Sequence, residues 1–322
     1  MKLGVMTVCL GHLPLEEALA YLKSLGVQEL EIGCGGSPGT AHCNAIEFLK
    51  DPAKIEAFKA TIDKYGMPIA ALSTHNNPVH PNKEIAAHDH AEFEAAVLLA
   101  EKLGVKTVVT FSGCPGDSEG AKHPCWTVAT WPTEHQEVRE WQWEEVLIPY
   151  WKKAGKFAAD HGVRVALEIH PGFLVYNPGT LLRLREAVGP VIGANFDPSH
   201  LFWQGIDPVA AIRLLGGEAI HHFHAKDTKL DPYNTAAYGV LDTRSFTDLG
   251  GRPWVFRTVG YGHSEAVWRD IFSELQSVGY NGIISIEHED GLMTQKEGLE
   301  KAVEVLKNTI IFQDRNTDMY WA

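Results

Sequence analysis

Short apolar runs bounded by turn residues recur eight times along the chain. They span residues 2–8, 29–33, 68–73, 107–111, 164–169, 192–197, 219–224 and 282–287. Their apolar character is nearly continuous, which predicts strands that are buried on both faces. A stretch with apolar residues three and four positions apart follows each run, as Ala18, Leu19, Leu22 and Leu25 do after the first, and predicts a helix.

The predicted helices alternate strictly with the predicted strands. They begin near Pro14, Pro52, Glu84, Gln136, Asn177, Asp207, Ser264 and Gln295. Eight such units are the number that closes a parallel sheet into a barrel. A doubly wound sheet is the alternative, but its usual glycine-rich phosphate loop does not follow the first strand, which runs into Cys9-Leu10-Gly11-His12. We therefore predict a single α/β domain, a (β/α)8 TIM barrel over residues 1–322 with a C-terminal tail at about 314–322.

Two predicted connections are much longer than the usual loops of such units. Residues 112–135 follow the fourth strand and are rich in Gly, Pro and Trp, and residues 227–263 follow the seventh strand. Loops that follow strands lie at the catalytic face of a barrel, so we expect both insertions to cover the site.

The composition of the chain disfavours some classes of binding partner. The chain has 41 acidic and 28 basic residues and a net charge of −13, which disfavours nucleic acid and anionic membranes as partners. The first ten residues do not resemble a signal peptide, so a cytoplasmic location is expected. The five cysteines lack a CxxC pair and are expected to be reduced thiols without a chemical role.

Ionisable residues concentrate at the ends of the last four predicted strands. Glu168, Asp197, His224 and Glu287 would converge on one half of the barrel mouth. Any one of them alone is explained as a helix cap or a buried loop residue. Together, three carboxylates and an imidazole would repel one another unless a cation lay among them. Oxygen-rich ligands with one histidine favour Mn²⁺ or Mg²⁺, with Co²⁺ as a substitute.

These segments resemble the xylose-isomerase-like TIM-barrel superfamily, the sugar phosphate isomerase/epimerase group. The matching runs are Leu167-Glu168-Ile169-His170-Pro171-Gly172, Asn195-Phe196-Asp197-Pro198-Ser199-His200, His224-Ala225-Lys226-Asp227-Thr228 and Ile286-Glu287-His288. The resemblance implies that Glu168, Asp197, His224 and Glu287 bind the metal and that Glu168 and Glu287 are the catalytic acid/base pair. It also implies that His200 contacts a substrate oxygen and that Arg257, before Gly260-Tyr261-Gly262, is the family's arginine and binds substrate.

Four further residues are predicted to contact substrate. Lys226 is expected either to donate to a substrate oxygen or to pair with a neighbouring carboxylate. His170 shares the inward face of Glu168 by strand alternation, whereas His288 does not share that of Glu287. His75 and Glu31, at the ends of the third and second strands, complete the set.

The chemistry implied by the resemblance is proton transfer beside a carbonyl of a sugar or polyol, through a metal-bound enediolate, as in an isomerase or epimerase of carbohydrate metabolism. A lyase or dehydratase acting on a keto-inositol or 3-oxo-glycoside is the alternative, for which Trp126, Trp131, Trp254 and Phe256 suit an aromatic entrance. A non-catalytic partner subunit and an abasic-site endonuclease come third, the latter opposed by the absence of a histidine after Thr110. The aromatic end of the tail suggests a homo-oligomer, with a hetero-oligomer as the alternative.

Overall fold

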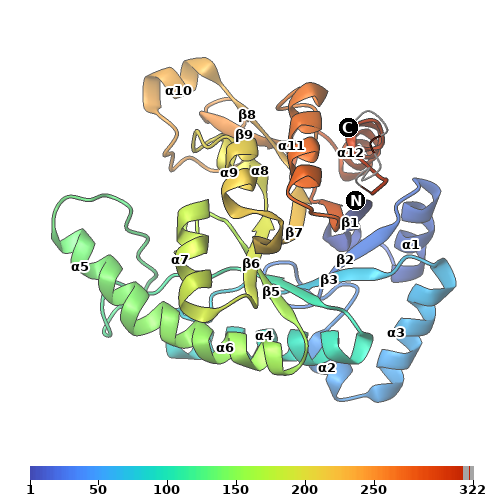
Figure 1. Cartoon of the computed structure of the whole chain (residues 1–322), viewed down its shortest axis with the longest axis horizontal. Helices are drawn as coiled ribbons and strands as arrows, with labels where there is room; N and C mark the ends of the chain where they lie inside the picture. Colours follow the sequence, from blue (N-terminus) through green and yellow to red (C-terminus); the bar gives the residue numbers. More distant parts are fainter. Residues whose placement is uncertain (315–318, 320–322) are drawn as a thin grey trace.

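Eight parallel strands close into a barrel in the computed structural model of the chain, which describes residues 1–314 and 319 (Figure 1). The barrel strands are β1 Lys2–Met6, β2 Glu29–Gly33, β3 Ile69–Ser73, β4 Thr107–Thr110, β5 Arg164–Glu168, β6 Ile192–Phe196, β7 Ile220–Ala225 and β10 Ile283–Ile286. Around the barrel they follow the order β1, β10, β7, β6, β5, β4, β3, β2. The predicted TIM barrel is confirmed. Apart from residues 314 and 319, the predicted tail lies outside the described part of the chain.

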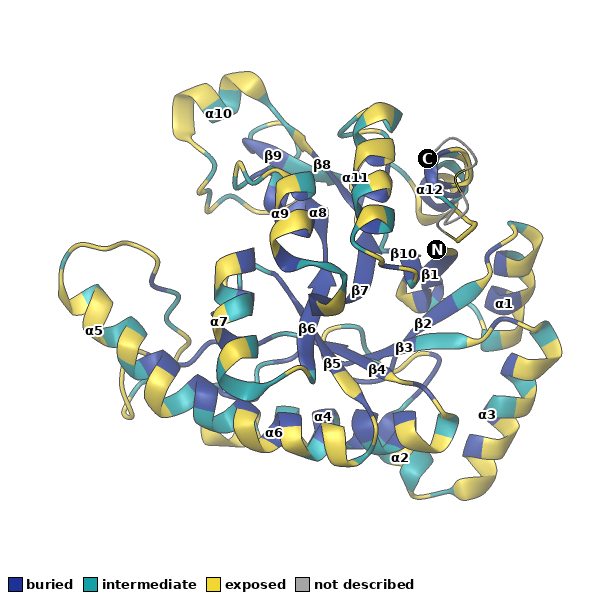
Figure 2. Ribbon diagram, in the orientation of Figure 1, coloured by how far each residue is buried: buried dark blue, intermediate teal, exposed yellow. Residues whose placement is uncertain are grey.

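Helices surround the barrel and turn their apolar faces toward the strands (Figure 2). They are α1 Leu15–Ser24, α2 Ala45–Leu49, α3 Pro52–Tyr65, α4 Lys83–Leu103, α5 Glu134–Trp141, α6 Ile148–Asp160, α7 Pro178–Val188, α8 Pro198–Phe202, α9 Pro208–Leu215, α10 Pro232–Tyr238, α11 Glu265–Ser277 and α12 Gln295–Thr309. Asn and Asp caps followed by proline fix several starts, as Asp207 does for α9, where its side chain accepts from the Ala210 amide. No helix in the described residues is long and apolar enough to cross a membrane.

The apolar core lies mainly between the strands and the helices. Inside the barrel the buried apolar cluster is small and consists of Ala71, Val109 and Ala166. The remaining interior toward the carboxyl ends of the strands contains charged and polar side chains, among them Glu31, His222 and His224, all buried. The middle of this barrel is therefore a polar layer, in which the buried charged side chains must pair or form hydrogen bonds with one another.

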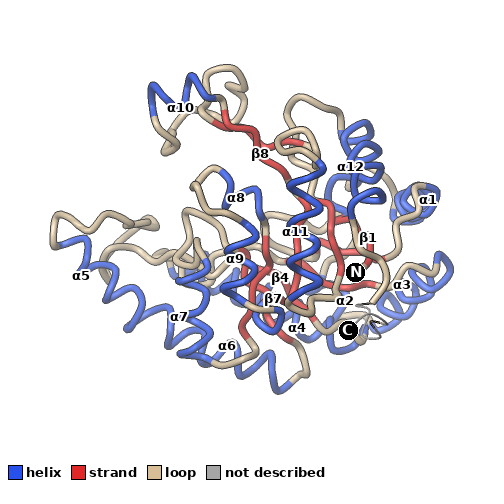
Figure 3. The backbone as a smooth tube through the Cα atoms, turned by 45° about the horizontal axis from the view of Figure 1, so that its top comes forward, coloured by secondary structure: helices blue, strands red, loops and turns tan. Residues whose placement is uncertain are grey.

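The insertion after β7 is folded rather than irregular. Strand β8, Asp227–Leu230, pairs antiparallel with β9, Trp254–Arg257, and α10 lies between them in sequence. In Figure 3, β8 leads away from the barrel toward α10. The predicted long loop is thus a hairpin with a helix, which holds residues such as Trp254 and Phe256 at fixed positions near the barrel mouth.

The Gly260-Tyr261-Gly262 turn anchors this hairpin to the end of β7. Asp227 Oδ2 accepts from the amides of Gly260 at 3.0 Å and Gly262 at 3.1 Å, and Asp227 Oδ1 lies 2.8 Å from His263 Nδ1. A Cβ atom on Gly262 would lie 2.3 Å from the Thr228 carbonyl oxygen and 2.4 Å from Asp227 Oδ1. The turn therefore requires a glycine at this position, because the neighbouring backbone has no room for a side chain.

Replacing Gly262 by Ala is expected to lower the free energy of unfolding by about 1–3 kcal/mol, the usual cost of forcing extra atoms into a packed region. Urea denaturation of the variant and the parent chain measures the difference. Gly250→Ala, in the same insertion, is the control, since its added Cβ would meet no atom within 4 Å. Equal stability of the two variants would contradict the packing argument.

All five cysteines are free, and four of them are buried. Burial raises the pKa of Cys9, Cys43 and Cys114 to about 12 and that of Cys34 well above its ordinary value. At pH 8 a thiol with such a pKa is ionised on the order of one part in ten thousand, so it reacts slowly.

A thiol reagent is expected to label only the half-buried Cys125 in the native chain and all five cysteines in urea. Rapid labelling of two or more cysteines in the native chain would refute this prediction.

Candidate active site

Four adjacent strand ends bring the predicted metal ligands together. Glu168 ends β5, Asp197 follows β6, His224 lies in β7 and Glu287 follows β10, and these strands are neighbours around the barrel. One ligand atom from each residue lies within 4.8 Å of the others. The two glutamates stand at the ends of this row, with Asp197 and His224 between them.

Lys226 is the cation in this group of carboxylates. Its Nζ lies 2.6 Å from Glu287 Oε2, 3.0 Å from Asp197 Oδ2 and 2.9 Å from Glu289 Oε2. Burial lowers the pKa of Lys226, but Asp197, Glu287 and Glu289 outweigh it and raise the pKa well above its ordinary value. Lys226 thus pairs with its neighbours, one of the two arrangements expected from the sequence, and remains charged within the site.

Glu168 is held by three donors. Its Oε2 lies 2.8 Å from His75 Nε2 and 3.1 Å from Asn195 Nδ2, while its Oε1 lies 3.1 Å from His200 Nε2. Burial raises the pKa of Glu168, but the contacts with His200 and His75 dominate and hold it well below its ordinary value. Glu168 is therefore a fixed carboxylate, and its side chain is only 2% exposed.

Glu287 is less enclosed than Glu168. Its side chain is 17% exposed, and its Oε2 lies 3.1 Å from His224 Nδ1 as well as close to Lys226. Burial raises the pKa of Glu287, but Lys226 and His224 lower it to about 2. Both glutamates are thus carboxylates near neutral pH, one rigidly held and one facing the solvent-connected side of the site.

The donor set fits a divalent metal ion. Asp197 Oδ1 accepts from the Ser199 amide at 2.8 Å, and its buried Oδ2 faces the Lys226 ammonium, whose Nζ is 3.0 Å away. Three carboxylates this close together are costly to bury unless positive charge lies among them, and a divalent ion would add to the charge of Lys226. Three carboxylates and one imidazole within reach of a common point supply the oxygen-rich coordination typical of Mn²⁺ or Mg²⁺.

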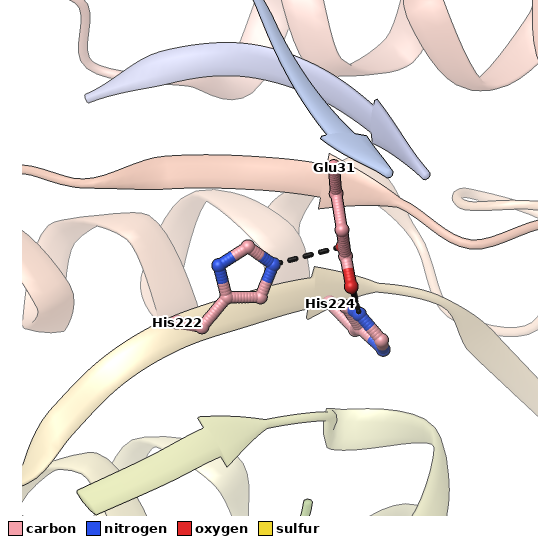
Figure 4. Close-up of side chains that lie close together, drawn as sticks. All are labelled: Glu31, His222 and His224. Carbon is pink, nitrogen blue, oxygen red and sulfur yellow. Dashed lines mark hydrogen bonds and ion pairs between the residues drawn. The ribbon is translucent and has the colours of Figure 1, made fainter. Parts of the chain in front are cut away.

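A second polar cluster lies directly beneath this site (Figure 4). Glu31 on β2 faces His222 and His224 on β7, with its Oε2 2.8 Å from His222 Nε2 and 3.0 Å from His224 Nε2. Ser73 and Ser285 also donate to the Glu31 carboxylate. His224 therefore bridges two layers, since its Nε2 faces Glu31 and its Nδ1 faces Glu168 and Glu287.

Glu31 consequently lies below the cavity rather than in it, although the sequence predicted a substrate contact.

His224 is affected by both clusters. Burial lowers the pKa of His224, but Glu31 and Glu287 raise it well above its ordinary value. His222 was not predicted from the sequence to belong to this cluster. The signal was present in β7, because His222, His224 and Lys226 alternate on one face of an extended chain.

A cavity of about 240 Å³ opens above the carboxylates. Its lining includes five predicted site residues, namely His75, Glu168, His170, Lys226 and Glu287. His75 Nδ1 is buried without a hydrogen-bond partner among the described residues. His170 Nδ1 lies 2.6 Å from the Pro171 carbonyl oxygen, so Nδ1 bears the proton. Burial lowers the pKa of His170 to about 3, so its ring is neutral at pH 7.

Two predicted substrate contacts lie elsewhere. His200 borders a neighbouring cavity and holds Glu168, and its Nε2 lies 3.3 Å from Asp197 Oδ2. Arg257 pairs with Asp290, with Nε 3.0 Å from Oδ2, and this contact ties β9 to the loop after β10. In this structure Arg257 therefore connects the insertion to the barrel.

His288 lines the 240 Å³ cavity, although strand alternation predicted that it would face away from Glu287. The prediction assumed that the strand continues through both residues. Strand β10 ends at Ile286, so Glu287 and His288 lie on a loop whose side chains no longer alternate. Glu289, the residue after His288, lines the same cavity and contacts Lys226.

Comparison with known proteins agrees with this architecture. The chain belongs to the family of xylose isomerase-like TIM barrels, whose sequence model matches residues 19–309. This family assignment confirms the resemblance seen in the sequence.

Two curated relatives and one solved structure illustrate the similarity. The chain is 42% identical to the uncharacterised protein YfiH of Bacillus subtilis (strain 168), over 96% of this chain and 99% of YfiH. It is 27% identical to the rhizopine catabolism protein MocC of Rhizobium meliloti, over 87% of this chain and 76% of MocC. The structure of the IolI protein with a bound zinc atom superposes with a TM-score of 0.66 at 19% identity, covering 96% of each chain, which shows a shared fold.

Proposed function

We propose that this chain is a divalent-metal-dependent sugar isomerase or epimerase that moves a proton on a carbon beside a carbonyl group. The observation that carries the proposal is the convergence of Glu168, Asp197, His224 and Glu287 within 4.8 Å at the barrel mouth. The zinc atom bound to IolI, which shares the fold, supports a divalent metal for this chain. We propose Mn²⁺ as that metal, with Mg²⁺ or Co²⁺ as substitutes.

A hydrogen beside a carbonyl is only weakly acidic, so its removal requires stabilisation of the oxyanion that forms. A divalent ion held by Glu168, Asp197, His224 and Glu287 would supply that stabilisation as a Lewis acid. Lys226, charged and within 3.0 Å of Asp197 and Glu287, adds positive charge at the same place. The chain's own residues thus favour developing negative charge on the substrate.

Glu168 and Glu287 are the proposed acid/base pair. Both are ionised before substrate binds, as a base must be, and they occupy opposite ends of the row of four ligands. One carboxylate takes a proton from the substrate carbon, and the other, after it has taken up a proton from solvent, delivers that proton to the opposite face, which inverts the carbon. Return of the proton to the adjacent carbon would instead exchange an aldose and a ketose.

His75 Nδ1 and the neutral His170 ring border the cavity above Glu168 and Glu287 and are proposed to contact substrate hydroxyl groups.

Proton exchange in D₂O followed by NMR tests the proposal. Protein stripped of metal would be offered a panel of ketoses and aldoses and then supplied with Mn²⁺. We expect deuterium to enter beside the carbonyl of at least one sugar only after metal is added, and the product to distinguish epimerisation from isomerisation. Exchange that is equally fast without metal, or absent from the whole panel with metal, would contradict the proposal.

A lyase or dehydratase is the second candidate function. After the same proton is removed, loss of a β-substituent in place of reprotonation gives an elimination. The observation that favours it is the space beside the site, where Trp126, Trp254 and Phe256 line a larger cavity able to receive a leaving group. Trp131, also predicted at the entrance, is 79% exposed. Keto-inositols and 3-oxo-glycosides in the same exchange assay would reveal an unsaturated product if this function is correct.

A further inference from the structure

A second and larger cavity adjoins the carboxylate site. Its volume is about 820 Å³, against about 240 Å³ for the cavity above Glu168 and Glu287. His170 and Glu289 border both cavities, so the two spaces are neighbours. Cavities that enclose drug-sized ligands usually measure about 300–1,000 Å³. The smaller cavity suits a compact polyol, and the larger one has room for a group attached to it.

Aromatic rings line the way from one cavity to the other. The His170 and His200 ring centroids are 4.0 Å apart, and those of His200 and Phe256 are 5.4 Å apart. Phe246 stacks on Phe256 with a centroid distance of 5.7 Å and an interplanar angle of 11°. Further along, Trp254 stacks on Trp203 at 4.7 Å and 5°. The wall nearest the insertion is thus built from flat apolar surfaces.

The charged groups of the larger cavity already have partners within the protein. Arg252 is 3% exposed and lies between Phe246 and Trp254, at 4.2 and 4.7 Å from the ring centroids, while it donates to backbone carbonyls. Arg244 pairs with Asp242, and Glu289 pairs with Lys226. The described lining residues therefore give two positive and two negative side chains, which leaves no net charge to attract a phosphate.

We propose that the larger cavity is a subsite for an uncharged aromatic substituent, so that the substrate is a keto-sugar that carries an aryl group and whose sugar ring occupies the carboxylate site. This inference rests on the proposed function for the position of the sugar. Aromatic side chains bind a flat aromatic ring by stacking or by edge contact. A second sugar ring would instead bring several hydroxyl groups that need hydrogen-bond partners, whereas the charged side chains of this cavity already have partners within the protein.

Calorimetric binding of matched glycosides tests this subsite. Methyl and phenyl β-glycosides of D-glucose and D-galactose, together with cellobiose, would be titrated into the chain with Mn²⁺ and again after metal removal. We expect the phenyl glycoside to bind about tenfold or more tightly than its methyl counterpart in at least one sugar series. We expect this ratio to survive metal removal, because the stacking residues are not the proposed metal ligands.

Two variants in different segments of the cavity lining locate the binding. Phe246→Ala in the insertion and Trp126→Ala in the loop after β4 are each expected to reduce the phenyl-to-methyl ratio several-fold, with methyl glycoside binding unchanged. Tyr233→Ala is the matched control, because this aromatic residue belongs to the same insertion but is 85% exposed and does not line the cavity. A circular dichroism spectrum of each variant verifies folding.

The outcomes separate the subsite from the chemistry. Equal binding of phenyl and methyl glycosides in both series, or tighter binding of cellobiose than of the phenyl glycoside, would overturn the aryl subsite even if proton exchange is observed. A phenyl preference lost in both wall variants would support the subsite even if no sugar undergoes exchange, and in that case only the proposed isomerase or epimerase function would fail.

Discussion

Replacement of Glu287 by Gln is expected to slow metal-dependent proton exchange on the order of 10³-fold, the usual range for removal of a general acid or base. Gln has nearly the same shape but cannot accept the substrate proton. Glu287 suits this test better than Glu168, because Glu168 accepts from His75, His200 and Asn195, and an amide there would face donors with an NH₂ group. The measurement is deuterium incorporation at several Mn²⁺ concentrations up to saturation.

Saturation with Mn²⁺ separates the two roles proposed for Glu287. If the residue only binds metal, exchange should return to the parent rate once the variant is fully loaded. If it also moves the proton, a large deficit should remain at saturation. Glu297→Gln, an exposed carboxylate in the first turn of α12, is the control and is expected to leave the exchange rate unchanged. Full recovery of Glu287→Gln at saturating metal would remove Glu287 from the acid/base pair.

Replacement of Glu31 by Gln is expected to raise the Mn²⁺ dissociation constant about 10–100-fold, the usual effect of losing a carboxylate that orients a metal-binding histidine. Glu31 accepts from His222, His224, Ser73 and Ser285, and it fixes the His224 ring so that Nδ1 faces the ligand row. The amide of Gln offers one acceptor oxygen in place of two. Isothermal titration with Mn²⁺ measures the change.

Glu29→Gln is the matched control for Glu31. Glu29 begins the same strand two residues earlier and is half-buried, but it does not belong to the Glu31, His222 and His224 cluster. The thermal midpoint of each variant would be measured alongside metal affinity. A lower midpoint for Glu31→Gln with an unchanged Mn²⁺ dissociation constant would mean that Glu31 stabilises the barrel interior without orienting His224.

The barrel and the clustering of Glu168, Asp197, His224 and Glu287 could be predicted from the sequence for a physical reason. Buried parallel strands must be apolar along nearly their whole length, so the change to Glu168, Asp197 and Glu287 at their carboxyl ends is conspicuous. Each barrel strand lies within two residues of its predicted bounds at either end. Once eight strands are placed in order, barrel closure alone makes the last four strand ends neighbours.

The polar layer beneath Glu168, Asp197, His224 and Glu287 could not be predicted in the same way. Glu31 and His222 are 191 residues apart, and their hydrogen bond crosses the barrel interior between strands that are not neighbours. A carboxylate at the end of a strand gives no indication of whether it faces the cavity or a histidine below it. Likewise, alternation failed at His288, because the point where β10 ends is set by packing and not by the local sequence.

The sequence by itself determined the barrel, the order of its strands and the convergence of Glu168, Asp197, His224 and Glu287, because the strand period, the burial pattern and the order of the elements can be read directly from the amino-acid sequence. Only the tertiary structure decided which partner each charge takes: Lys226 among three carboxylates, Arg257 on Asp290, and Glu31 on two histidines. It also decided that the insertion after β7 folds into a hairpin whose aromatic residues line a second cavity. These features depend on contacts between segments that are far apart in the sequence. The distances and angles of those contacts are set only when the chain folds.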